Sequence, residues 1–268
     1  MSLYEQRSHL SHFLLTVAVG TAEADEIAAE LWSLGAVGIE ELSGGLRAAF
    51  TESDQAERAR LALAPDEPVE VIGDQYGLDA ARDLLRVERA GLFAVHPPWL
   101  EPPPDAQSIV IDPGHAFGSG SHVSTRLALA LLGDEIETGH RVFDVGCGTG
   151  VLSIGAALLG ASVTAVDIEP AAIEATMANA ERNDVEDRVQ PILGSADLIT
   201  DPVDLVLVNV TIDIHEAIAP ALSRAHPRLL VAGLLGADQL DRCASAHHSS
   251  IVRSITDDGW MAAVLARS

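Results

Sequence analysis

The residues with the clearest chemical meaning lie between positions 144 and 150, where the sequence reads Asp-Val-Gly-Cys-Gly-Thr-Gly. This segment follows an apolar run typical of a buried strand and precedes a stretch with helical spacing. Gly146, Gly148 and Gly150 allow a tight turn and a close approach of the backbone to a ligand, where any Cβ atom would collide. Because a helix N-terminus favours a carboxylate or phosphate, the segment predicts a ligand-binding loop.

The glycine spacing argues against a nicotinamide dinucleotide site. That fingerprint is Gly-x-Gly-x-x-Gly or ends in Ala, whereas its last position here holds Val151 or Ser153, depending on the starting glycine. An acid, Asp167, ends the next apolar run, where it can accept hydrogen bonds from both hydroxyls of a ribose. Together the loop and the acid predict an adenosine-containing ligand, although each alone also fits a tight turn and a helix-capping Asp.

Two further polar residues follow later apolar runs. Asn209 closes the run at 204–208, and its side-chain carbonyl can accept a hydrogen bond from an amine, although Asn at a strand end is also a common turn residue. Asp197 follows the run at 189–193 and suits either contact with the amino group of an adenine or the capping of a helix.

Alternating strands and helices must position these residues. Near-continuous apolar strands separated by helices indicate a parallel sheet covered on both faces, and an antiparallel pair closes the chain. The predicted strands are 141–145, 162–166, 189–193, 204–208, 228–232, 250–256 and 260–266, and the predicted helices are 151–159, 170–183, 213–223 and 237–247.

A smaller α/β unit is predicted over residues 1–95. Its predicted strands are 12–19, 37–42, 46–50 and 69–72, and its predicted helices are 22–34, 53–64 and 79–87. Five prolines between positions 96 and 106 disfavour helix and favour a stiff, extended chain. The sequence therefore predicts a linker at 96–107 and a second domain at 108–268.

The composition limits the choice of partners. The 268 residues carry a net charge of −24, with 40 acidic residues against 16 basic residues that are all Arg. This balance argues against nucleic acid and membrane surfaces and favours a basic protein or a cationic small molecule, although it also serves solubility alone. No uninterrupted apolar run reaches the 18 or so residues that a membrane span requires.

The cysteines and histidines indicate no metal site. Cys147 and Cys243 are too few for a disulfide framework or a zinc site, which favours a reducing, intracellular setting and a cytoplasmic location. The histidines show no metal-ligand spacing along the chain, and His247 and His248 are expected at the surface.

From Asp144 onward the sequence resembles the class I S-adenosylmethionine-dependent methyltransferases. Their pattern is Asp-x-Gly-x-Gly-x-Gly, an acid closing the second strand and a polar residue closing the fourth. Residues 111–126, Ile-Asp-Pro-Gly-His-Ala-Phe-Gly-Ser-Gly-Ser-His-Val-Ser-Thr-Arg, resemble more narrowly the ribosomal protein L11 methyltransferase family, as do residues 31–41, 97–99 and 233–239.

The resemblance implies an α/β fold with a doubly wound, mostly parallel seven-stranded sheet and a small N-terminal α/β domain. It implies S-adenosylmethionine as cofactor and Asn209 as the residue that orients the acceptor nitrogen. Phe117 is expected to face the sulfonium or the adenine, or else to be a buried hinge residue, and His122 to fix its loop by hydrogen bonding. The resemblance implies Thr125, Gly146, Asp167 and Asn209 as cofactor-binding residues. The loop motif and the residue chemistry add Asp144, Gly148, Phe117 and Asp197 as further candidates.

The implied reaction is methylation of lysine amino groups in a basic ribosomal protein, L11, recognised by the N-terminal domain. One segment departs from the family: Val-Thr-Ile-Asp-Ile-His at 210–215 replaces its usual apolar-Leu-Ala continuation. These residues are expected to line the acceptor side. Two alternatives therefore stay open, a methyltransferase for a small-molecule amine and a cofactor-binding module without catalysis.

Overall fold

The computed structural model describes residues 12–20, 24–36, 38–42, 44–50, 53–72, 86–112, 122–222 and 228–267. The chain divides into two compact units, Met1–Leu85 and Arg86–Ser268. Among the described residues, no helix is both long and apolar enough to cross a bilayer.

The first unit contains a four-stranded antiparallel sheet with the order β2-β3-β1-β4. Leu15, Leu31 and Phe50 are fully buried in its core, so the apolar sides of strands and helices meet there. The predicted helix at 79–87 falls largely outside the described residues. The elements are β1 His12–Ala18, α1 Ala24–Ser33, β2 Gly38–Leu42, β3 Gly45–Phe50, α2 Ser53–Leu63 and β4 Glu70–Ile72.

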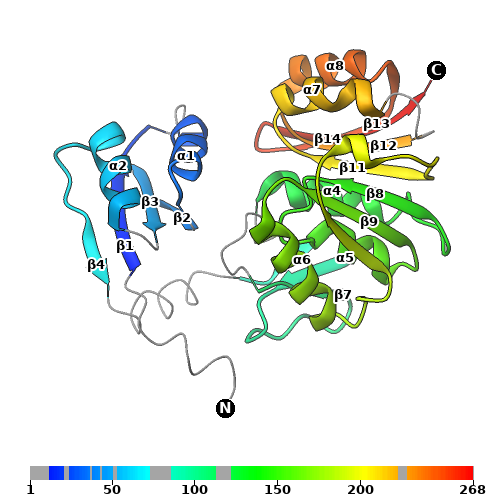
Figure 1. The fold of residues 1–268 in the computed structure, drawn as a ribbon, viewed down its shortest axis with the longest axis horizontal. Coiled ribbons are helices and arrows are strands. Elements are labelled where there is room, and N and C mark those ends of the chain that lie inside the picture. The colour runs from blue at the N-terminus through cyan, green and yellow to red at the C-terminus, as the bar shows by residue number, and fades with distance from the viewer. Residues whose placement is uncertain are drawn as a thin grey trace. The chain divides into compact units, whose positions relative to one another are not determined.

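The second unit contains the predicted seven-stranded sheet, in the order β10-β9-β8-β11-β12-β14-β13 (Figure 1). Neighbouring strands from β10 to β12 are parallel, and β14 runs antiparallel to both β12 and β13. The doubly wound fold class is thereby confirmed. The strands are β8 Arg141–Val145, β9 Ser162–Asp167, β10 Val189–Leu193, β11 Leu205–Asn209, β12 Arg228–Leu235, β13 Ser249–Asp257 and β14 Trp260–Arg267.

Helices cover both faces of this sheet. Val142 packs in one core with residues of α4, α5 and α6, whereas Phe143 packs in a second core with residues of α7 and α8. Successive side chains of a strand point to opposite faces, so one buried strand supplies both cores. The helices are α4 Val123–Leu132, α5 Val151–Leu158, α6 Pro170–Arg182, α7 Ile212–Leu222 and α8 Gly236–Ala246.

The proline-rich segment does not separate the two units, contrary to expectation. The boundary falls between Leu85 and Arg86, and the prolines lie inside the second unit, in the crossover from β6 (Phe93–His96) to β7 (Gln107–Val110). These strands pair in parallel, and β5 (Glu88–Ala90) completes a three-stranded sheet. A proline-rich stretch is stiff and lacks N–H donors, and these properties suit a crossover loop as well as a linker.

Candidate functional site

The glycine loop has the backbone conformation that its sequence predicts. Gly146, Gly148 and Gly150 have φ values of +73°, +56° and +83°, in the left-handed region that residues with a Cβ rarely adopt. A Cβ on Gly150 would lie 2.9 Å from side-chain atoms of Thr176 in α6. The loop therefore requires glycine for its conformation and, at Gly150, also for its fit against α6.

Asp167 lies beside this loop, at the carboxyl end of β9. Its Oδ2 accepts a hydrogen bond from the Gly148 N–H at 3.0 Å, and its Oδ1 accepts one from the Glu169 N–H at 3.0 Å. An ionised carboxylate has about four acceptor positions, so both oxygens keep capacity for a ligand. The fold thus brings together the two features that predicted an adenosine-containing ligand.

Asp144 lies beneath the loop rather than on its open side. Its side chain is 1% exposed, and its Oδ2 accepts a 2.6 Å hydrogen bond from the Ser153 hydroxyl in α5. Burial raises the pKa of Asp144 to about 7; the Ser153 hydrogen bond opposes this shift, and the nearby charge of Asp167 adds to it. This arrangement supports the loop through α5 and leaves Asp144 without a surface to offer a ligand.

Asn209 ends β11, the strand next to β8, and its side chain is held by Thr125. The Asn209 Nδ2 donates to the Thr125 Oγ1 at 3.2 Å, and Thr125 is buried in the first turn of α4. With its Nδ2 held by Thr125, the side-chain amide of Asn209 can use its oxygen to accept a hydrogen bond from a ligand. The chain leaves β8 toward β9 on one side and returns to β11 on the other, which is the topological switch point where open α/β sheets bind ligands.

His122 fixes the start of α4. As its N-cap residue, His122 accepts at Nδ1 a 3.2 Å hydrogen bond from the Ser124 N–H, and its ring lies edge-on to Trp260 at a centroid distance of 4.6 Å. These contacts agree with the loop-fixing interpretation. Phe117 and the rest of the glycine-rich segment at 113–121 lie outside the described residues.

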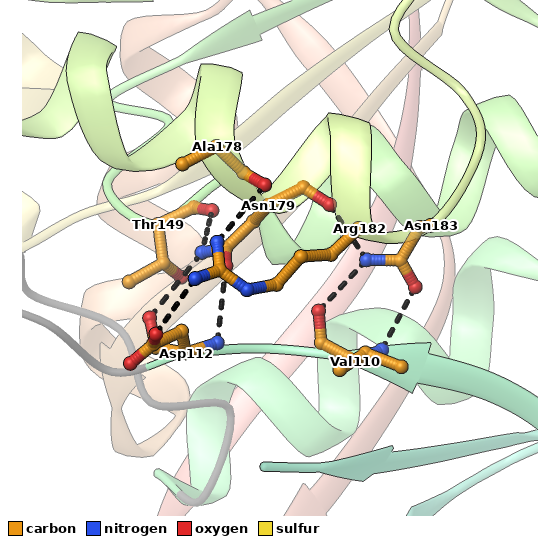
Figure 2. Close-up of polar contacts among 7 residues, drawn as sticks. All are labelled: Val110, Asp112, Thr149, Ala178, Asn179, Arg182 and Asn183. Carbon is orange, nitrogen blue, oxygen red and sulfur yellow. Dashed lines mark hydrogen bonds and ion pairs between the residues drawn. The ribbon is translucent and has the colours of Figure 1, made fainter. Parts of the chain in front are cut away.

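Polar residues of α6 and its C-cap, Asn183, connect the segment before 113–121 to the glycine loop (Figure 2). Asn179 accepts from the Asp112 N–H at 3.0 Å and donates to the Thr149 carbonyl at 3.0 Å. Asn183 pairs with both the N–H and the carbonyl of Val110, and Arg182 forms a 2.9 Å ion pair with Asp112. One helix therefore sets the relative position of two loops that are distant in sequence.

Sequence reasoning missed this network and a related contact from Thr176. The Thr176 hydroxyl, fully buried in α6, donates to the Gly148 carbonyl at 3.0 Å and also contacts the Cys147 sulfur. The available signal was the spacing of Thr176, Asn179 and Asn183 along one helix face, where such residues are poor helix formers. The Cys147 thiol is buried, which raises its pKa to about 12, so it stays protonated at neutral pH.

The structure also describes Asp197 and the segment at 210–215. Asp197 is exposed in the short 3-10 helix η1 (Ala196–Leu198), whose N-cap is Ser195 and not Asp197. In the segment expected to line the acceptor side, Thr211 is exposed, but Ile212 and His215 are buried in the core on the α7 side. The expectation is therefore wrong for Ile212 and His215, because α7 begins there and turns these side chains inward.

Comparisons with known proteins agree with this architecture. Residues 69–268 match the family model described as ribosomal protein L11 methyltransferase (PrmA). The ribosomal protein L11 methyltransferase of Ectopseudomonas mendocina is 36% identical over 230 residues, covering 80% of this chain and 78% of the relative. That of Thermus thermophilus is 37% identical over 220 residues, covering 81% and 84%.

A solved structure is also similar. The ribosomal protein L11 methylase of Lactobacillus delbrueckii subsp. bulgaricus aligns with a TM-score of 0.62 and 25% identity, over 68% of this chain and 98% of that chain. The family model spans most of the chain, and the identities to both relatives exceed 30% over most of its length. The chain belongs to the ribosomal protein L11 methyltransferase family.

Proposed function

We propose that this protein transfers methyl groups from S-adenosylmethionine to lysine amino groups of ribosomal protein L11. Family membership supports the reaction and its protein substrate. The observation that carries the proposal is the convergence of the glycine loop, Asp167 and Asn209 at adjacent strand ends around the switch point of the sheet.

The residues present fit the cofactor. Asp167 would hold the ribose hydroxyls, and Gly146 and Gly148, which have positive φ values and no side chain, would let the methionine part approach the backbone. Thr125 and Asn209 border the reacting end, Phe117 covers the sulfonium or the adenine, and Asp197 contacts the adenine amino group. Asp144 contributes from beneath, by supporting the loop.

When bound, S-adenosylmethionine would supply an electrophilic methyl group, whose bond to the sulfonium sulfur breaks as a bond to a neutral amine nitrogen forms on the opposite side. The protein therefore has to position the amine, and this needs no strong base. The amide oxygen of Asn209, oriented through Thr125, accepts a hydrogen bond from the lysine nitrogen. An acidic surface attracts the lysine but raises its pKa, so its proton must leave to water as the amine is desolvated.

The first unit, residues 1–85, serves in this proposal to bind the protein substrate. A net charge of −24 attracts a basic ribosomal protein before it is assembled with RNA, whose phosphates repel the enzyme. The proposal accordingly places the enzyme in the cytoplasm, acting on free L11 and contacting neither nucleic acid nor membrane.

Incubation with labelled S-adenosylmethionine, purified L11 and a ribosomal extract tests the function. Label in L11, located on lysines by peptide mass spectrometry, is the expected result, and Asp167→Ala serves as the inactive control. Label confined to small molecules would instead assign a small-molecule amine methyltransferase. Cofactor binding without any transfer would assign a non-catalytic module.

A further inference from the structure

Three possible metal ligands gather in the core on the α7–α8 side of the sheet. His215 lies on α7, Cys243 lies on α8, and His247 is the residue that follows α8 as its C-cap. The side chains of His215 and Cys243 are fully buried and that of His247 is 3% exposed, so His247 does not lie at the surface as expected. One ligand atom from each residue lies within 4.8 Å of the other two.

His215 keeps one ring nitrogen unprotonated. Its Nε2 lies 3.0 Å from the carbonyl oxygen of Ala232 in β12, and a carbonyl only accepts, so the ring proton is on Nε2. The buried Nδ1 is then an acceptor, and it has no hydrogen-bond partner among the described residues. Burial also lowers the pKa of His215 to about 4, which keeps the ring neutral at neutral pH. A buried acceptor without a partner is unfavourable, so a bound cation would stabilise this group.

The helix backbone places the other two candidate ligands, Cys243 and His247, near His215. Cys243 and His247 are four positions apart, which puts them on one side of α8 and its final turn. The His215 and His247 rings meet edge-on, with centroids 5.9 Å apart. Burial raises the pKa of the Cys243 thiol to about 12, so the cysteine carries its proton when no ion is bound.

We propose that His215, Cys243 and His247 bind one thiophilic transition-metal ion, Zn²⁺ or Cu⁺. Two imidazoles and one thiolate match the ligand preference of both ions. The hydrogen bond from His215 to the Ala232 carbonyl matches the outer contact that orients metal-binding histidines. On binding, the Sγ–H bond of Cys243 breaks, its proton passes to solvent, and the sulfur bonds to the ion as a thiolate.

The geometry requires only a modest adjustment. Bonds of about 2.0–2.3 Å to the ion place the ligand atoms roughly 3.5 Å apart, so atoms that lie within 4.8 Å of one another close by at most about 1.3 Å. A surface hollow on the outer side of α7 and α8 is lined by residues close in sequence to the three ligands, Glu216, Asp241, Arg242, Ser245 and Ala246. The site joins α7, the helix that follows Asn209, to α8, and it uses no residue of the cofactor site.

Metal analysis of the untagged, full-length protein tests the site. After chelator treatment and addition of Co²⁺, the expected product holds one Co²⁺ per chain with a near-ultraviolet thiolate-to-cobalt band. Zn²⁺ should displace Co²⁺ and raise the midpoint of thermal unfolding. The same titration with Cu⁺ under anaerobic conditions distinguishes the two ions. If the protein binds Cu⁺ but neither Co²⁺ nor Zn²⁺, and binding requires Cys243, the site is supported and is assigned to Cu⁺.

Two variants test whether metal binding depends on this cluster or on other residues of the protein. Cys243→Val, which keeps an apolar group in the core, should abolish the cobalt band and the thermal shift, whereas His248→Gln, at the exposed neighbouring histidine, should retain both. Circular dichroism and S-adenosylmethionine binding report whether Cys243→Val remains folded. Absence of stoichiometric Co²⁺, Zn²⁺ or Cu⁺ in the wild type overturns the proposal, as does a cobalt band that persists in Cys243→Val.

Discussion

At the scale of single residues, the proposed cofactor site depends on the surroundings of two carboxyl groups, those of Asp167 and Asp144. Asp167 is partly exposed and keeps acceptor capacity beyond its two backbone hydrogen bonds, whereas Asp144 is buried and bound to Ser153. The two acids are close enough that the charge of Asp167 contributes to the raised pKa of Asp144. The first acid therefore suits a ligand, and the second supports the loop.

Substitution of Asp167 should remove most cofactor affinity. Two hydrogen bonds to a charged group contribute about 1.5–3 kcal/mol each, so Asp167→Ala should weaken S-adenosylmethionine binding by about 100-fold or more. Isothermal titration calorimetry measures this directly. Glu169→Ala, at an exposed acid two positions later, is the matched control and should bind normally. Unchanged affinity in Asp167→Ala would refute the placement of the ribose.

The buried Asp144 should make stability depend on pH. Its folded-state pKa of about 7 lies above the ordinary value of 3.8, so the folded protein binds this proton more tightly than the unfolded chain. Between about pH 4 and 7 this group therefore makes unfolding easier as the pH rises, by a few kcal/mol in total.

Asp144→Asn has no titrating group at this position and serves as the comparison. The free energy of unfolding of the wild type minus that of Asp144→Asn should fall as pH rises through this range, as measured by urea denaturation. A difference that stays constant with pH would show that Asp144 does not titrate there.

At the scale of elements, α6 connects the two loops of the site. Asn179 holds both Asp112, which precedes residues 113–121, and the carbonyl of Thr149 in the glycine loop, whereas Asn183 holds only Val110 and its own helix. The two asparagines are one helical turn apart, yet only Asn179 contacts the glycine loop. They therefore allow a matched test of loop positioning.

Asn179→Ala and Asn183→Ala should each destabilise the fold by about 1–3 kcal/mol, because each leaves buried or partly buried backbone groups without partners. Only Asn179→Ala should also weaken S-adenosylmethionine binding, by roughly tenfold, since it alone frees the glycine loop. Urea denaturation and calorimetry provide the two readouts. Equal cofactor affinities in the two variants would assign Asn179 a purely structural role.

The sequence predicted most strands and helices because their apolar periodicity is strong, and β8 begins and ends as predicted. It placed the end of β12 too early, since Gly233 interrupts the apolar run. The strand continues to Leu235 through a bulge, where a Cβ at Gly233 would lie 2.4 Å from the Val210 carbonyl oxygen. Helix α4 and strands β5 to β7 were not anticipated.

The polar network was less predictable than the glycine loop. Gly146 and Asp167 follow apolar runs, so their position at strand ends could be inferred from the sequence. Whether Asn179 is buried or exposed depends on which segment packs against α6, and that segment lies 67 positions away in the chain. Periodicity contains no information about such a contact. The proximity of His215 to Cys243 could not be predicted either, because it too is a contact between residues distant in sequence.

At the scale of the whole molecule, charge distinguishes the partners. The enzyme has no lysine and a net charge of −24, whereas the proposed substrate is a basic protein with lysine acceptors. Opposite net charges accelerate encounter at low ionic strength and lose this effect as salt screens them. Apart from its N-terminal amine, the enzyme also offers itself no acceptor.

Rising ionic strength should therefore lower kcat/KM for free L11, while kcat changes little. Initial rates measured between about 0.05 and 0.5 M salt, where the Debye length shortens severalfold, test this. L11 already assembled with RNA should be methylated more slowly than free L11 at low salt. A flat or rising kcat/KM would indicate that the acidic surface serves solubility alone.

The parallel pairing of β6 with β7 determines where a fragment containing the second unit can begin. A fragment starting at residue 108 would discard β5 and β6, and with them Phe93 and Val95 from a core that also contains residues of α4 and α5. A fragment starting at Arg86 retains that sheet complete. We therefore expect the smallest fragment that carries the proposed cofactor site to include the prolines, and a domain exchange within the family should place its junction before Arg86.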